Sequence, residues 1–129
     1  MASEVKSRKD RRKDPNEWMA IGRFLRCPPD KARLRARLLP GKGVEDALNL
    51  LRNSETSSAR LISKVLYSAM YNAINTSKPN PPEPDQLVVR SVVIDKGKFL
   101  KRHQPVSHGK AEPILKRTCH ITVTVARKP

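Results

Sequence analysis

Aromatic side chains are scarce in this chain, at 4% of 129 residues. Proteins that bind single-stranded nucleic acid stack bases on aromatic side chains, so this composition argues against most such stacking platforms. The cysteines, Cys27 and Cys119, have no metal-ligand spacing and indicate a reducing compartment. His103, His108 and His120 fit no ligand motif either, so no metal site is expected.

Long hydrophobic runs are also missing. No stretch approaches the ~20 apolar residues that a membrane span requires, so no membrane partner is expected. The opening residues Met1 to Glu4 form no apolar signal segment, and the acids at positions 4, 10 and 14 argue against an uncleaved transit peptide. Asp85 and Asp95 lack a paired carboxylate, and no nucleophile–base constellation appears. Neither an enzyme nor a cofactor is therefore predicted.

Positive charge, in contrast, is abundant. Lysine and arginine number 27 against 12 acids, which gives a formal charge of +15 and places the chain with proteins that bind nucleic acid or anionic membrane. The length suits one domain, predicted over residues 17–129. Residues 1–16 are a basic tail without apolar periodicity, which is either solvated or becomes ordered on phosphates.

Helices are predicted over three segments. Apolar residues repeat at helical spacing over residues 44–51 and 56–75. A first helix is expected to begin at Pro28-Pro29-Asp30 and to end at Pro40-Gly41. Residues 18–26 are either a short strand or an irregular extended segment, and a strand that joins a later sheet is favoured. The four prolines of residues 78–84 predict a stiff, extended connector.

The last third of the chain, residues 85–128, is predicted to be a hairpin. Both arms alternate β-branched residues near their outer ends, which predicts strands with one buried face. On the returning arm Cys119 belongs to that buried face, and His120 to the polar face, where contact with phosphate, ribose or solvent is expected. Arms of about 15 residues would reach roughly 50 Å. A compact core of this chain spans only about 25–30 Å.

The far part of the hairpin, about residues 96–117, must therefore project beyond the core. It carries seven basic residues against the single acid Glu112. A lone two-stranded ribbon is marginally stable in water, and like charge weakens it further. The ribbon is accordingly predicted to need a polyanion around it.

Residues 114–123 (ILKRTCHITV) resemble the C-terminal signature of large-subunit ribosomal protein twenty-two, in its bacterial or organellar type. The resemblance continues in Lys101-Arg102, Pro105 and Gly109, in the KARL of residues 31–34, and in the VEDAL of residues 44–48. These blocks occur in order and at family spacing from about Phe24 to Val125.

This resemblance implies an α+β fold, with three helices packed on a small antiparallel sheet and a long protruding β-hairpin. It also implies a structural constituent of the large ribosomal subunit that acts in translation. Such a protein binds rRNA, lies beside neighbouring ribosomal proteins and supports subunit assembly, and its hairpin tip lines the peptide exit tunnel and meets the nascent polypeptide. The location implied is a ribosome in a bacterial cytoplasm, a plastid or a mitochondrion.

The residues predicted to bind rRNA share a basic or imidazole side chain. They are Arg23, Arg26, Lys31, Arg33, Lys98, Lys101, Arg102, Lys110, Lys116, Arg117 and His120. The predicted tunnel tip is Pro105, Val106, Ser107, His108, Gly109 and Lys110. Asp30 would repel a phosphate, so contact on the first helix should shift toward Lys31 and Arg33. On composition alone, a DNA-binding architectural protein that inserts a β-ribbon into a groove is the alternative.

Overall fold

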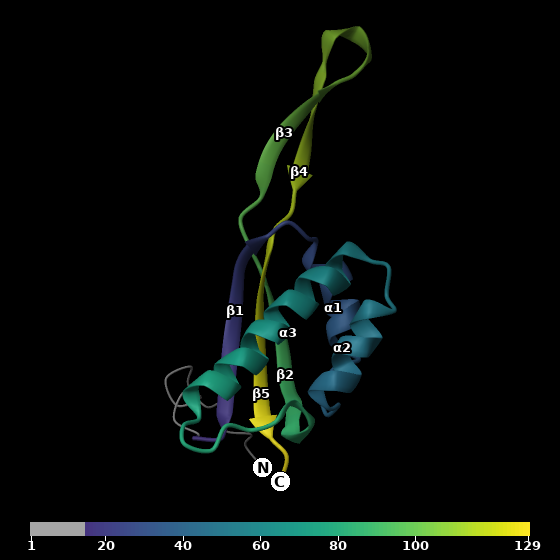
Figure 1. The fold of residues 1–129 in the computed structure, drawn as a ribbon. Coiled ribbons are helices and arrows are strands. Elements are labelled where there is room, and N and C mark those ends of the chain that lie inside the picture. The colour runs from purple at the N-terminus through teal and green to yellow at the C-terminus, as the bar shows by residue number, and fades with distance from the viewer. Residues whose placement is uncertain (1–14) are drawn as a thin grey trace, which may run out of the picture.

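The computed structural model describes residues 15–129, so all but two residues of the predicted tail lie outside the described part. The elements follow in the order β1 (Glu17–Leu25), α1 (Pro29–Ala36), α2 (Val44–Arg52), α3 (Ser57–Thr76), η2 (Pro84–Gln86), β2 (Leu87–Lys96), β3 (Leu100–Pro105), η3 (Ser107–Gly109), β4 (Ala111–Lys116) and β5 (Cys119–Arg127). The helices pack beside one sheet, and a narrow two-stranded ribbon rises from its end (Figure 1). The predicted α+β class is confirmed.

The body of the protein is built on a three-stranded sheet in the order β1-β5-β2. Both pairings are antiparallel, so the last strand of the chain lies between the other two. Alternation along β5 places Cys119, Ile121, Val123 and Val125 in the core, each 0% exposed. The residues between them are only half-buried, which confirms the two faces predicted for this strand.

A β-bulge in β2 corrects the alternation of that strand. Val89 pairs with Val125 and Ser91 with Thr124, so Arg90 is the extra residue. The inserted residue moves the next apolar positions back to the core face, where Ile94 is buried opposite Ile121. The six apolar residues of β2, in two groups of three on either side of Arg90 and Ser91, are therefore divided between both faces of the sheet, and Val93 is exposed on the second face.

Helix α3 lies across β1 and β5 and supplies most of the helical core (Figure 1). Its predicted seam, Ala59, Ile62, Leu66, Ala69 and Ala73, is 0% exposed throughout. The helix approaches β1 closely at Gly22, because a Cβ added there would lie 2.8 Å from Val65 Cγ2. The amphipathic pattern of α2 is also confirmed, with Val44, Ala47, Leu48 and Leu51 buried.

The first helix ends earlier than predicted. Helix α1 stops at Ala36, and the amides of Leu38 and Leu39 donate to carbonyls three residues back, a tighter turn than the α-helix. This turn places Leu39 in the core, 0% exposed, and leaves Leu38 on the surface. Gly41 then takes a positive φ of 84°, which reverses the chain before α2. Of the predicted connector at residues 78–84, residues 78–83 contain neither helix nor strand, as the prolines predict, and Pro84 begins the short helix η2.

The ribbon joins the body through a tight contact between Gly97 and Thr118. The Gly97 amide donates to the Thr118 carbonyl at 2.9 Å, and Thr118 Oγ1 donates to the Lys98 carbonyl at 2.7 Å. Thr118 is only 4% exposed, although Arg117 before it, and Lys96 and Lys98 on either side of Gly97, are exposed. We call this contact the Gly97–Thr118 latch, since it closes the gap between the body sheet and the ribbon.

Candidate nucleic-acid interface

The ribbon is formed by β3 and β4, which pair only with each other. Each strand has six residues, so the paired part spans about 20 Å at ~3.3 Å per residue. Nearest the body, every cross-strand pair joins one basic and one apolar residue: Leu100 with Lys116, Lys101 with Leu115, and Arg102 with Ile114. Like charges directly opposite each other would destabilise the pairing, and this register avoids them.

The same register places positive charge on both faces of the ribbon. Successive residues of a strand point to opposite faces, so Lys101 and Arg102 extend in opposite directions. All six predicted basic residues of the ribbon are exposed, namely Lys98, Lys101, Arg102, Lys110, Lys116 and Arg117. Arg117 lies 5.6 Å from the centre of the Phe99 ring, a cation–π contact that orders its guanidinium beside the latch.

The tip of the ribbon is a turn around η3. The Val106 amide donates to the Lys110 carbonyl at 2.9 Å and closes the turn. His108 and Gly109 both have positive φ, 63° and 67°, which glycine adopts freely and histidine at some cost. The six residues of the predicted tip therefore lie together at the far end of the ribbon, away from the helices (Figure 1).

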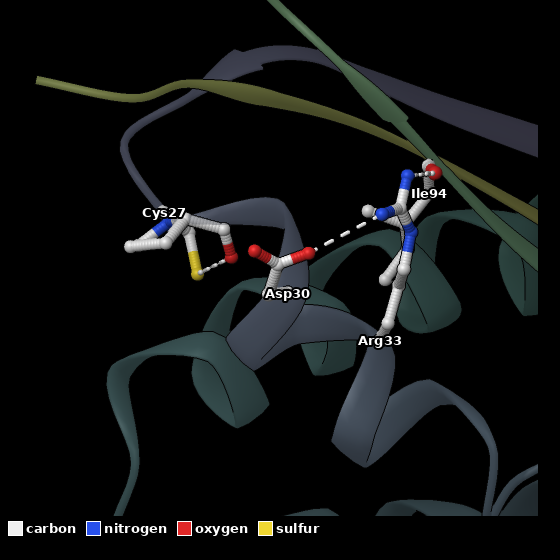
Figure 2. Close-up of polar contacts among 5 residues, drawn as sticks. Cys27, Asp30, Arg33 and Ile94 are labelled. Atoms are coloured by element: carbon white, nitrogen blue, oxygen red, sulfur yellow. Dashed lines mark hydrogen bonds and ion pairs between the residues drawn. The ribbon is translucent and has the colours of Figure 1, made fainter. Parts of the chain in front are cut away.

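On the body, Arg23, Arg26 and Lys31 are exposed, whereas Arg33 is held by the protein itself. Figure 2 shows the Arg33 guanidinium between Asp30 and the backbone of β2. Its Nη2 donates to the Ile94 carbonyl at 3.1 Å, and its Nη1 lies 3.4 Å from Asp30 Oδ1. The charge of Asp30, which the sequence suggested would repel phosphate, is therefore offset by Arg33. This intramolecular contact with β2 was not foreseen, and it gives Arg33 a role in positioning α1.

Acidic side chains gather at the other end of the body, where β2 begins. Glu45 lies in the first turn of α2, and hydrogen bonding to Asp85, together with the charge of Asp85, raises the pKa of Glu45. Gly43 bridges to Val88 at the start of β2, which is the end of the sheet away from the ribbon. This acidic group lies at the end of the sheet away from the ribbon, whereas Glu112 on β4 and Asp95 near the end of β2 are the acids closer to the basic residues.

The two cysteines lie in the core between the sheet and α1. Cys119 is 0% exposed and Cys27 1% exposed, and the Cys27 thiol donates to the Pro28 carbonyl at 3.5 Å (Figure 2). Burial, together with the neighbouring Cys27, raises the pKa of Cys119 to about 11, and burial also raises the pKa of Cys27. The prediction that Cys119 is a small buried side chain is confirmed.

His120 lies on the second face of β5, where its ring contacts Phe24. Its Nδ1 accepts a hydrogen bond from the Phe24 amide at 3.0 Å. Sequence reasoning proposed His120 for the interface but overlooked Phe24, which is 59% exposed. Only the pairing of β1 with β5 brings these residues together, and they are 96 positions apart.

Residues 15–129 hold no group of three or more His, Cys, Asp or Glu side chains placed to bind a metal ion. Over the same residues, no helix combines the length and the apolar character needed to cross a bilayer.

A small α+β body with an exposed ribbon that carries basic residues on both faces is typical of proteins that bind folded nucleic acid. These features place the chain in that class. The family model described as ribosomal protein L22p/L17e matches residues 20–126. The chain is 45% identical over 112 residues to large ribosomal subunit protein uL22 of Syntrophobacter fumaroxidans, covering 87% of this chain and 99% of that protein. It is 44% identical over 105 residues to the protein of the same name from Geobacter sulfurreducens, covering 81% and 92%. For Thermus thermophilus the identity is 41% over 112 residues, covering 87% and 96%.

The chain therefore belongs to the ribosomal protein L22p/L17e family. It is a structural, non-enzymatic protein of the large ribosomal subunit, associated with rRNA and ribosomal proteins. The relatives named here are bacterial, which favours the ribosome of a bacterial cytoplasm among the locations considered.

Proposed function

We propose that this protein binds large-subunit rRNA through its ribbon and through the base of its body, and so supports assembly of the subunit. The single observation that carries the proposal is the ribbon itself, which displays basic side chains on both faces and has no other described element packed on it. Two paired strands alone are marginal in water. Phosphates on both sides would neutralise the charge and hold the ribbon extended.

Lys98, Lys101, Arg102, Lys110, Lys116 and Arg117 would contact phosphates along the ribbon. On the body, Arg23, Arg26, Lys31 and His120 are the proposed contacts. Arg33 remains a candidate at its partly exposed edge, although two of its guanidinium nitrogens already have protein partners. Phosphate contacts position a protein without reading base sequence, so specificity would come from the shape of folded rRNA.

The tip of the ribbon, Pro105 to Lys110, is proposed to line the peptide exit tunnel and to meet the nascent polypeptide. The geometry supports this because the tip lies at the end of the ribbon farthest from the body (Figure 1). The tip contains Pro105 and Gly109, and Lys110 is its one lysine or arginine, so it carries no cluster of charge. A photo-reactive amino acid placed at Ser107 should cross-link to a stalled nascent chain on intact ribosomes. The same group placed at Tyr71 on α3 should not, and equal labelling from both positions would contradict the tunnel assignment.

The rRNA contact is tested on Lys101 and Arg102, which point to opposite faces of the ribbon. The double variant Lys101→Glu/Arg102→Glu should be depleted from purified large subunits, as measured by quantitative mass spectrometry of cells that express a tagged copy. The matched control Arg60→Glu/Lys64→Glu changes the net charge equally on exposed positions of α3. Normal incorporation of the ribbon variant, or equal depletion of both variants, would contradict the proposal that the ribbon binds rRNA.

A binding measurement sharpens this test. The neutral variant Lys101→Gln/Arg102→Gln should lower the slope of log K against log salt for an rRNA transcript by about 1.4–1.8, since each neutralised phosphate contributes roughly 0.7–0.9. An unchanged slope would mean that neither side chain contacts a phosphate.

A further inference from the structure

The edge strand β1 carries a bulge opposite His120. Gly22 pairs with Ile121 and Leu25 with Cys119, so Arg23 and Phe24 together face one residue of β5. Phe24 has a φ of 53°, a left-handed conformation that bulky residues rarely adopt. Such a conformation is energetically costly and is found mainly where a surrounding structure imposes it, often at functional sites.

The bulge exposes an aromatic ring and fixes the histidine beside it. The Phe24 and His120 rings meet edge to face, with centroids 4.8 Å apart and an interplanar angle of 85°. The Phe24 amide donates to His120 Nδ1, so the ring hydrogen of the neutral histidine is on Nε2, which stays available as a donor. Since an edge-to-face pair leaves a ring face open and Phe24 is 59% exposed, a third ring can stack there.

The surroundings of this pair favour a nucleic acid over an apolar protein partner. Arg23 lies within the bulge and Arg26 directly follows β1, and both are exposed. On β2, Asp95 is the neighbour of His120, whereas Lys96 pairs with Cys119 and therefore belongs to the other face of the sheet. Two arginines and one carboxylate near an exposed aromatic ring match the combination that single-stranded RNA sites use, a stacking surface flanked by phosphate contacts.

We propose that Phe24 and His120 form a stacking platform for an unpaired base of rRNA. The base stacks on the Phe24 ring, His120 Nε2–H donates to an oxygen or nitrogen of the same nucleotide, and Arg23 and Arg26 contact the flanking phosphates. The proposal rests on the proposed rRNA binding and extends it, because the ribbon contacts require only phosphates. It also revises the expectation, drawn from the low aromatic content, that such platforms are mostly missing here.

The test uses the purified full chain and short oligoribonucleotides that carry the fluorescent base 2-aminopurine, whose emission falls on stacking. Phe24→Leu removes the flat ring, and Phe24→Gly removes it while allowing the positive φ freely. Both should bind about 5- to 150-fold more weakly and lose the fluorescence change, the range expected for one stacked base. Because Phe24 carries no charge, the slope of affinity against salt should stay as in the wild type. Phe24→Trp should retain binding.

Two controls keep the outcome unambiguous. Tyr71→Leu removes another exposed aromatic ring, 54% exposed on α3, and should leave the affinity unchanged. An abasic oligomer reports phosphate contacts alone, so wild type and Phe24→Leu should bind it equally. Salt-dependent binding of RNA with no difference between wild type and both Phe24 variants would overturn the platform and leave the ribbon function standing. Failure of the wild type to bind any RNA would overturn both.

Discussion

Gly97→Ala is expected to destabilise the protein, although the residue itself lies in an ordinary backbone conformation. A Cβ at position 97 would overlap Thr118 Oγ1 and lie 3.3 Å from both the carbonyl carbon and the Cβ of Thr118. Thr118 is buried and its hydroxyl is already bonded to the Lys98 carbonyl at 2.7 Å, so it cannot turn away without losing that bond. The Gly97–Thr118 latch therefore has no room for a methyl group.

The expected magnitude combines three effects. Overpacking a close contact costs about 1–3 kcal/mol. Displacing the Thr118 hydroxyl adds about 0.5–1.5 kcal/mol for the lost hydrogen bond. Alanine offsets roughly 0.4–1 kcal/mol by restricting the unfolded chain. Gly97→Ala should thus lower the free energy of unfolding by about 0.5–4 kcal/mol, with a central value of about 2 kcal/mol.

A double-mutant cycle identifies the cause. Thr118→Ala removes the overlapping oxygen, so adding Gly97→Ala to that background should cost at least about 1 kcal/mol less than in the wild type. Urea denaturation followed through Trp18, the single tryptophan and a half-buried residue of β1, measures all four proteins. Additive effects, within about 0.5 kcal/mol, would refute the reasoning, because they would show that the two positions do not share a contact.

Two further predictions concern the core and α1. Arg33→Ala should lower the free energy of unfolding by about 1–2 kcal/mol through loss of its bond to the Ile94 carbonyl. Asp30→Asn should change it by less than about 0.5 kcal/mol, because the Asp30–Arg33 pair is 78% and 39% exposed. An equal loss in both variants would contradict the assignment of Arg33 to β2. For the thiols, the pKa of Cys119 is raised from 9.0 to about 11 in the folded protein, so the unfolded state releases its proton first as the pH rises. The stability contributed by the neutral thiol is complete below pH 9 and should fall between pH 9 and about 11. Cys119→Ala should flatten this part of the stability curve relative to the wild type, and an unchanged slope would refute the effect.

Much of the body could be predicted from the sequence because its buried positions repeat at regular spacing. The seam of α3 and the alternation of β5 are local patterns, and each corresponds to a buried face in the structure. The end of helix α1 was harder to predict, since its short apolar pattern continues to Leu39 although the helix ends at Ala36. Leu39 is buried because a tighter turn follows the helix, and hydrophobic periodicity does not distinguish such a turn from a continuing helix.

Contacts between distant segments could not be predicted in the same way. The Phe24–His120 pair depends on a bulge, and a bulge is a property of two strands in register rather than of either strand alone. The same holds for Arg33 and the Ile94 carbonyl, which are 61 residues apart. The ribbon was foreseen from its charge and from the resemblance, whereas the pairing of each basic residue with an apolar partner required the register.

The position of β5 has a consequence for how the chain matures. Within the described chain, β1 and β2 pair with β5 and not with each other, so neither has a partner until residues 119–127 have been made. Until then the apolar seam of α3 has only an unpaired strand on each side and no sheet to cover it. The body sheet therefore cannot form before β5 has been translated. A chain truncated before residue 119 is expected to expose apolar residues and to be sensitive to proteases. We expect the body to fold only after β5 has been translated, because β5 supplies the pairing partner of both other strands of the sheet.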